Sequence, residues 1–135
     1  MTYLLDTNVC IRLLNNTSPA VRNRLAVEQP ENIYLCTVVQ VELYYGAYRS
    51  ANPEPNIALL ERFFSQSSIL PLDVRAARIT GQLRAQLAAL GTPIGPYDLQ
   101  IAAIALANNL TLVTHNTREF SRVEGLRIED WEEVE

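Results

Sequence analysis

The 135-residue chain contains no lysine, one histidine and only two cysteines. All of its basic residues are therefore arginines, whose planar guanidinium suits bidentate contacts to phosphate or carboxylate. A single histidine with two widely separated cysteines excludes a Cys/His zinc site. Cys10 lies in a helical pattern far from Cys36. The two do not form a disulfide framework, which is typical of a protein from a reducing compartment.

The chain also lacks a targeting segment and a membrane-spanning run. Four residues separate Met1 from Asp6, which leaves no room for a basic n-region and an apolar h-region. The longest apolar run, 99–107, is interrupted by Gln100 and is too short to cross a bilayer. We therefore expect a cytoplasmic protein without membrane contact.

The negative charge is concentrated at one end of the chain. The formal net charge is −4, but residues 124–135 carry six acids against Arg127 alone. The rest of the chain is close to neutral, so an anionic substrate is permitted but not required. Arginines on solvated helix faces account equally well for most of the positive charge.

Short apolar runs alternate with helical patterns, as in a parallel sheet covered on both faces. The predicted strands are 2–5, 33–36, 69–72, 110–114 and an edge strand at 126–128. The predicted helices are 9–14, 19–29, 37–49, 56–66, 74–90 and 96–109, with a capped turn at 116–119. Ser18, Thr37 and Asp73 are the expected N-caps. This pattern predicts one α/β domain over residues 1–131, with four or five short strands, followed by an acidic tail at 132–135.

Three carboxylates are expected to meet at one edge of this sheet. Asp6 directly follows the first strand, Glu42 lies in the second turn of the helix after the second strand, and Asp98 begins the most apolar helix. Helices that follow parallel strands start at the carboxyl edge, where open α/β folds bind ligands. Clustered acids are costly unless paired or metal-bound, and no arginine adjoins them in sequence. A hard divalent cation, Mg²⁺ or Mn²⁺, is the natural partner.

Each acid also has a simpler interpretation. Asp6 could be only a helix N-cap, Asp98 only a favourable charge at a helix N-terminus, and Glu42 only a solvated side chain. Glu42 is the hardest to explain this way, because Val38 and Val39 flank it one turn earlier. The separate explanations do not account for why all three meet at one edge.

Asn116, after the last inner strand, is a fourth candidate at the same edge. It could equally open a capping box with Glu119. His115 beside it is more typical of a rim or core residue than of a general base.

Four motifs then carry a resemblance to a known family. They are Met1-Thr-Tyr-Leu-Leu-Asp-Thr-Asn8, Val41-Glu-Leu43 with Gly46, Gly95-Pro-Tyr-Asp98 followed by Ile101-Ala102, and Leu112-Val-Thr-His-Asn-Thr-Arg-Glu-Phe120. In this order and spacing they resemble PIN domains, and more narrowly VapC-type toxins of bacterial type II toxin–antitoxin systems. The ending Gly125-Leu-Arg-Ile-Glu-Asp-Trp131 is also similar to this group.

The resemblance implies a three-layer PIN-like fold and a Mg²⁺-dependent endoribonuclease, with Mn²⁺ a plausible substitute. Asp6, Glu42 and Asp98 would hold the metal, and metal-activated water would hydrolyse structured RNA, with tRNA the favoured target. The family often has a fourth acid where this chain has Asn116, and Glu119 could supply the missing charge. Asn8, Thr114 and Asn116 would orient the carboxylates.

The resemblance also implies partners: a cognate VapB-like antitoxin that covers the active site, a second copy of the chain in a homodimer, and RNA. Candidate RNA contacts are the arginines Arg12, Arg75, Arg78, Arg84 and Arg118.

Two other interpretations remain open at this point. Phosphatases and phosphoacceptor domains also begin with a strand that ends in aspartate, but they require a second aspartate where Asn8 stands, or a nearby lysine. A non-catalytic PIN-like domain that only binds RNA or a partner stays possible because of Asn116.

Overall fold

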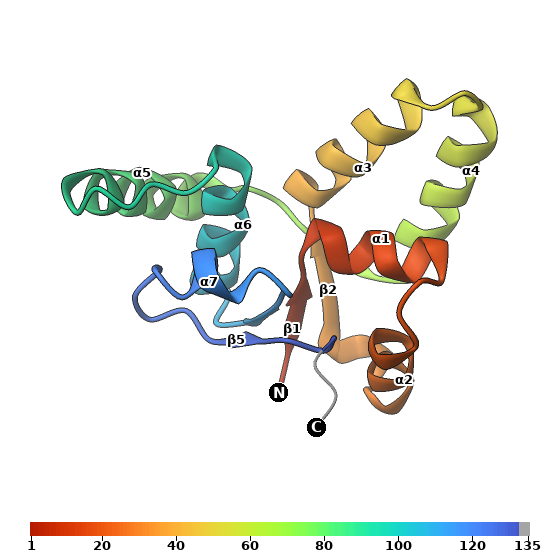
Figure 1. Ribbon diagram of the computed structural model, residues 1–135, viewed down its shortest axis with the longest axis horizontal. Helices are drawn as coiled ribbons and strands as arrows, with labels where there is room; N and C mark the ends of the chain where they lie inside the picture. The colour runs from red at the N-terminus through yellow and green to blue at the C-terminus, as the bar shows by residue number, and fades with distance from the viewer. Residues whose placement is uncertain (133–135) are drawn as a thin grey trace.

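The computed structural model describes residues 1–132 and shows a five-stranded parallel sheet between two layers of helices (Figure 1). The strands are β1 (Tyr3–Leu5), β2 (Ile33–Cys36), β3 (Ser68–Leu70), β4 (Thr111–Val113) and β5 (Ile128–Glu129). The helices are α1 (Thr7–Asn15), α2 (Pro19–Val27), α3 (Thr37–Arg49), α4 (Pro53–Phe64), α5 (Val74–Ala89), α6 (Pro96–Ala107) and α7 (Thr117–Phe120), with a 3-10 turn η1 (Pro30–Asn32). These elements confirm the predicted α/β class.

The strand order, β3-β2-β1-β4-β5, explains the layers. The chain first builds the sheet in one direction, from β1 to β3, and then crosses back to add β4 on the other side of β1. Because parallel crossovers are right-handed, this reversal puts the later helices on the opposite face. Figure 1 shows α1 to α4 on one side of the sheet and α5 and α6 on the other. The reversal point, between β1 and β4, is where such sheets form a binding crevice.

The core is built from the strands and from α6. Leu4, Leu35 and Leu112 on the three central strands are fully buried. α6 buries Ile101, Ala102, Ala103, Ile104 and Ala105. A helix that is apolar nearly all round belongs in the interior, and the small alanines let it lie close to its neighbours. No helix among residues 1–132 has the length and hydropathy needed to span a membrane.

Most element boundaries lie within two residues of the sequence expectations, including the edge strand, which runs over 128–129 rather than 126–128. Three differences have a clear physical reason. α4 begins at Pro53 rather than at 56, because proline is tolerated in the first turn of a helix. β3 ends at Leu70, before Pro71, which has no N–H for a ladder hydrogen bond. The capping box expected at Thr37 is wrong: Cys36 is the N-cap, and the Thr37 hydroxyl accepts a hydrogen bond from the Leu72 N–H at 3.1 Å.

The carboxyl end of the described chain packs against the sheet. The buried Trp131 ring meets Tyr3 edge to face, with centroids 5.2 Å apart, and the Arg24 guanidinium lies 5.0 Å from the Trp131 ring centroid. Glu132, the first residue of the predicted acidic tail, pairs with Arg12 at 3.2 Å. The remainder of that tail, 133–135, lies outside the described residues. The two cysteines are free and buried, as expected.

Candidate active site

Asp6 stands where β1 ends and α1 begins, next to the reversal point of the sheet. It is only 5% exposed, and its Oδ1 accepts a hydrogen bond from the Val9 N–H at 2.9 Å. It is therefore the N-cap of α1. Burial raises the pKa of Asp6, while hydrogen bonds from the Thr114 hydroxyl and the Val9 N–H act in the opposite direction.

Glu42, on α3, is half-buried and close enough to Asp6 for its negative charge to act on that carboxyl group. Its Oε1 accepts a short hydrogen bond of 2.6 Å from the Thr7 hydroxyl of α1. The sequence suggested that Glu42 points inward along an apolar stripe. Val38 and Val39 are buried as this requires, but Tyr45 and Gly46, one turn later, are exposed. Glu42 thus lies where the stripe reaches solvent.

Asp98 is the third residue of α6, at the N-terminal end of the helix that enters the core. Its pKa is raised to about 6, first by burial and then by the negative charges of Glu42, Glu119 and Asp6. Carboxylates from α3, α7 and the end of β1 therefore act on this one group. The structure brings together the three acids that the sequence analysis placed at one edge, with Glu119 beside them.

Thr114 and Asn116 connect Asp6 to Glu119. Thr114 is fully buried, and its hydroxyl accepts a hydrogen bond from the Asn116 N–H at 3.0 Å. The Asn116 side chain donates to Glu119 Oε2, also at 3.0 Å. Asn116 occupies the N-cap position of α7, as the alternative interpretation expected, but its side chain makes no capping hydrogen bond. Its amide instead holds the Glu119 carboxylate.

Sequence reasoning chose Asn8 as an orienting residue and missed Thr7. Asn8 is exposed and makes no side-chain hydrogen bond within residues 1–132, whereas Thr7 donates to Glu42 across 35 positions of sequence. Local spacing holds no signal for this contact, because it depends on how α1 and α3 pack. The motif placed both residues in the first turn of the helix but could not rank them.

None of the three acids is neutralised by a basic side chain. In the part of the chain that the structure describes, the ion pairs join Arg12 to Glu132, Arg24 to Glu28 and Glu129, and His115 to Asp130 and Glu132. Asp6, Glu42 and Asp98 appear in none of them. The cluster of Asp6, Glu42 and Asp98 therefore holds an uncompensated negative charge, which favours binding of a cation.

A second group of possible metal ligands lies in His115, Asp130 and Glu132. Among residues 1–132 this is the one set of three His, Cys, Asp or Glu ligand atoms within 4.8 Å of one another. Its members are already paired, however: His115 Nδ1 lies 2.9 Å from Asp130, and Arg12 holds Glu132. The hydrogen bond to Asp130 raises the pKa of the exposed His115. His115 is thus a rim residue, as its position at a strand end suggested.

Comparisons with known proteins match this geometry. The PIN domain family model matches residues 3–126. The chain is 46% identical to the tRNA(fMet)-specific endonuclease VapC of Shigella flexneri, covering 97% of this chain and 98% of the relative. It is 37% identical to Ribonuclease VapC2 of Rickettsia felis, and the match covers 98% of this chain and 99% of the relative.

Among solved structures, DNA-bound VapBC from Salmonella typhimurium contains a similar chain. The TM-score is 0.91 at 44% identity, covering 97% of this chain and 98% of that one. These matches rule out the phosphatase and phosphoacceptor interpretations, whose folds and motifs differ. By sequence over nearly its whole length, and by the fold that carries its acidic cluster, this chain belongs to the PIN-domain family and, within that family, to the VapC proteins.

Proposed function

We propose that this chain is a Mg²⁺-dependent endoribonuclease that acts as the toxin of a toxin–antitoxin pair. The observation that carries the proposal is the acidic cluster itself: Asp6, Glu42 and Asp98 lie near one another without a basic partner, and their mutual repulsion contributes to the raised pKa of Asp98. The names of the relatives, a tRNA endonuclease and a ribonuclease, supply the substrate class.

The residues present fit a hard divalent cation. All three offer carboxylate oxygens, the ligands that Mg²⁺ and Mn²⁺ prefer, and the absence of a thiolate or imidazole among them disfavours softer metals. Asp6 and Asp98 are the proposed direct ligands, and Glu42 binds directly or through water. Glu119, held by Asn116, is positioned to contribute to a second ion.

In the proposed reaction, water hydrolyses an RNA phosphodiester in line. Bound Mg²⁺ would lower the pKa of the attacking water and stabilise charge on the phosphoryl oxygens. The chain's own part is to aim the ligands. The cap bond from Val9 and the Thr114 hydroxyl fix Asp6, and the Thr7 hydroxyl fixes Glu42. Fixed carboxylates need no reorganisation when the charge develops.

The proposed partners follow from the relatives. Solved structures similar to this chain are VapBC complexes from Salmonella typhimurium, Rickettsia felis and Haemophilus influenzae, so we propose a VapB-like antitoxin for this chain. A groove of about 280 Å³ beside Glu42, lined by aliphatic side chains, suits an apolar segment of such a partner. Its apolar residues are Ile11, Leu14, Leu43, Leu59 and Leu60. An arginine of the partner would pair well with the acidic cluster of Asp6, Glu42 and Asp98.

A tRNA substrate, cytoplasmic location and homodimer remain predictions, as does the division into a domain over 1–131 and a short acidic tail. The two buried free thiols agree with a reducing compartment.

The function is tested with antitoxin-free protein and a structured RNA, in Mg²⁺ and in chelator. We expect cleavage only with the cation, and products with 5′-phosphate and 3′-hydroxyl ends or the reverse, since attack by water leaves no 2′,3′-cyclic phosphate. Intact RNA under both conditions would favour the rival function, a PIN-like domain that binds RNA or a partner without cutting.

Metal binding should depend on pH through Asp98. Because its pKa is about 6 without metal, Asp98 is ionised and ready to bind above pH 7, and it must lose a proton to bind below pH 6. The apparent Mn²⁺ affinity is expected to be flat above pH 7 and to fall by up to about tenfold per unit below pH 6. Calorimetric titrations from pH 5 to 8 measure it, and a flat profile throughout would contradict the assignment.

Thr7 is a positioning residue in this account. Thr7→Val keeps the shape of the side chain but removes the hydroxyl that donates to Glu42 at 2.6 Å. We expect kcat to fall about tenfold, which corresponds to the loss of one hydrogen bond to a charged group. Thr7→Ser restores the hydroxyl and should restore most of kcat. Equal activity of the valine and serine variants would show that the contact does not matter.

A further inference from the structure

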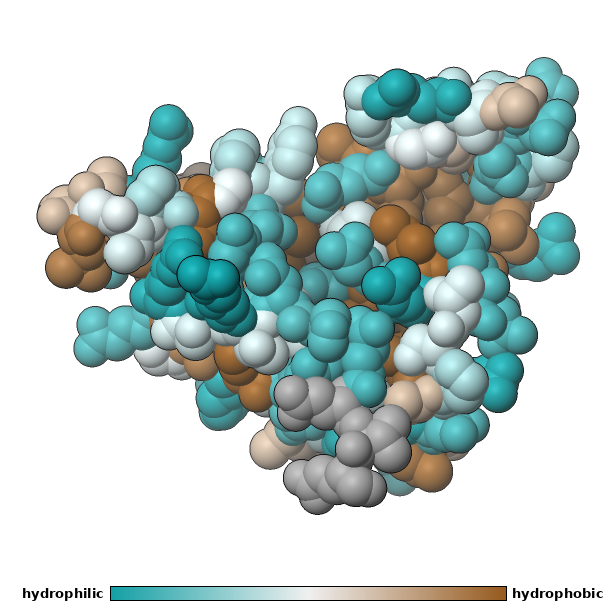
Figure 2. Space-filling view, in the orientation of Figure 1, coloured by the Kyte–Doolittle hydropathy of each residue, from teal (hydrophilic) through white to brown (hydrophobic). Residues whose placement is uncertain are grey.

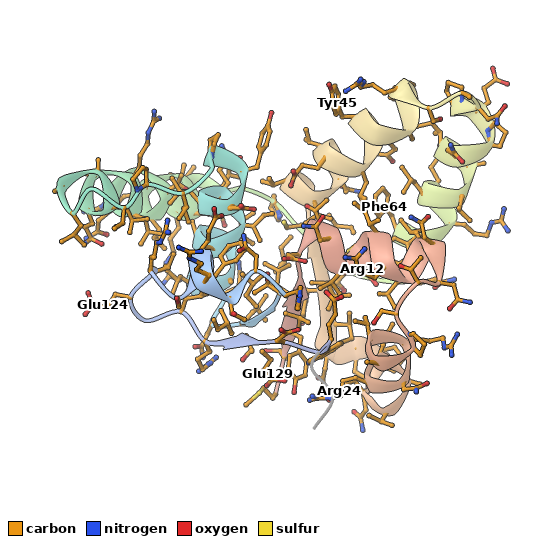
Figure 3. All side chains as sticks on the ribbon, viewed as in Figure 1. Arg12, Arg24, Tyr45, Phe64, Glu124 and Glu129 are labelled. Carbon is orange, nitrogen blue, oxygen red and sulfur yellow. The ribbon has the colours of Figure 1, made fainter. Side chains whose placement is uncertain are left out.

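Two exposed tyrosines border a hollow on one side of Glu42. The hollow has a volume of about 440 Å³ and is lined by Val41, Glu42, Tyr45 and Tyr97. Tyr45 is 62% exposed and Tyr97 49%. Tyr45 comes from α3 and Tyr97 from the first turn of α6, one residue before Asp98. Figure 3 shows Tyr45 on the side of α3 that faces α6. The two rings that line the hollow therefore come from two different helices.

No other aromatic ring covers these two tyrosines in the part of the chain that the structure describes. Elsewhere, Tyr3 packs on Trp131, and Tyr44 and Phe63 pack on Phe64. Neither Tyr45 nor Tyr97 contacts another aromatic ring within the described residues. Exposed aromatic surface beside a proposed reaction centre is typical of a binding site rather than of a packing element.

Arg49 adds a positive charge to this otherwise acidic rim. It lies one turn after Tyr45 on α3, with its guanidinium 5.5 Å from the ring centroid and Nη1 3.2 Å from the tyrosine hydroxyl. The contact holds the Tyr45 ring in place, and the exposed guanidinium remains able to meet a phosphate. Aromatic rings next to an arginine are the usual components of single-stranded RNA sites.

Glu42 separates this aromatic hollow from the aliphatic groove described above, since it lines both. In Figure 2 the apolar surface of the groove gathers between α3 and α4. Branched aliphatic side chains on that side suit the apolar residues of a protein partner. Flat, polarisable rings on the other side suit a nucleobase, which stacks on aromatic faces whatever its sequence.

We propose that Tyr45 and Tyr97 hold an unpaired base of the RNA next to the scissile phosphate, with Arg49 contacting the adjoining backbone. The inference rests on the proposed ribonuclease function and narrows its substrate class. A base can enter the hollow only after it leaves a helical stack, so the preferred site lies in a loop, bulge or single strand and not inside a duplex. Tyr45 and Tyr97 are thus specificity-determining residues for the reaction at Asp6, Glu42 and Asp98.

Binding is tested separately from cleavage, in an Asp98→Asn background with Mg²⁺ present. The probe is a short RNA hairpin with 2-aminopurine at one loop position at a time, whose fluorescence is quenched when the base stacks. We expect quenching at one position. Tyr45→Ala or Tyr97→Ala should weaken binding about tenfold and abolish the quenching, whereas Tyr45→Phe and Tyr97→Phe keep the ring and should stay within about twofold.

A second readout is RNA cleavage by the same tyrosine variants made in the chain that keeps Asp98. The alanine variants should lose activity through KM, with kcat within about threefold, because neither tyrosine is itself a proposed metal ligand. Tyr48→Ala is the matched control: it removes an equally exposed ring of α3 that lines a different hollow with α4, and should bind and cleave like the unsubstituted chain.

Three results would overturn the proposal. First, the alanine variants could bind the hairpin as tightly as the parent. Second, the phenylalanine variants could lose as much hairpin affinity as the alanine variants. Third, the alanine variants could lose only antitoxin binding, which would assign the hollow to the protein partner. If the protein binds the hairpin and quenches the 2-aminopurine fluorescence but never cleaves RNA, the proposed base-binding site would be supported and the ribonuclease function refuted.

Discussion

Replacing Asp98 with asparagine should reduce RNA cleavage by about a thousandfold or more. The substitution keeps the size of the side chain and removes the negative charge that the divalent cation requires. Metal-assisted stabilisation of a phosphoryl transition state is worth several kcal/mol, and each 1.36 kcal/mol is tenfold in rate. Loss of about 4 kcal/mol therefore gives the expected effect, measured as a single-turnover rate at saturating Mg²⁺.

Asp73→Asn is the matched control for this substitution. Asp73 caps α5 through a 2.9 Å hydrogen bond from the Ala76 N–H, and asparagine caps helices about as well as aspartate. We expect it to cleave at the parent rate. The Asp98 variant should also melt no lower than the parent, because it removes a charge that burial and neighbouring acids disfavour. Cleavage within tenfold of the parent would contradict the role given to Asp98.

Trp131→Ala should give a large loss of stability, about 3–5 kcal/mol in the free energy of unfolding. The ring is buried, meets Tyr3 edge to face, and lies under the Arg24 guanidinium; its Nε1 donates to Glu129 at 3.1 Å. The substitution leaves a cavity beside Tyr3 of β1 and removes the cation–π contact with Arg24. Urea unfolding measures the loss.

Trp131→Phe retains part of the ring stack and should lose less than half as much. At low temperature, where the alanine variant stays folded, its cleavage rate should approach that of the parent, since Trp131 is not one of the proposed ligands. A loss of less than 1 kcal/mol for the alanine variant would show that the end of the chain does not stabilise the sheet.

The sequence predicted the fold because its local signals and its topology agree. Ser18 and Asp73 cap the helices where expected, Gly91 takes a positive φ of 71° after α5, and the short apolar runs are all parallel strands. Once the strands are parallel, their carboxyl ends must share an edge. The convergence of Asp6, Glu42 and Asp98 was therefore predictable without any side-chain contact.

The failures concern side chains whose partners lie far away in the chain. The sequence predicted Thr37 as part of a capping box, but its hydroxyl accepts a hydrogen bond from the Leu72 N–H. It predicted Asn8 as an orienting residue, but Thr7 donates the hydrogen bond to Glu42. Both observed bonds span 35 positions. The spacing of residues within one helix does not indicate which side chain bonds to a partner on another element. Which of two adjacent polar residues makes such a bond depends on how the elements pack, and only the structure shows this.

Asn116 shows the same limit at the site itself. Its motif fitted a capping box as well as a ligand, and the structure uses its amide to hold Glu119. The sequence also could not show that Glu132 folds back onto Arg12, close to His115 and Asp130, and so forms a second group of possible ligands.

The position of a bound Mn²⁺ ion tests the central claim most directly. Anomalous diffraction from crystals grown with Mn²⁺ locates the ion without reference to activity. The account predicts a peak in contact with Asp6 and Asp98 and beside Glu42, which is absent in the Asp98→Asn variant. A peak at His115, Asp130 and Glu132 instead, or an unchanged peak in the variant, would contradict it.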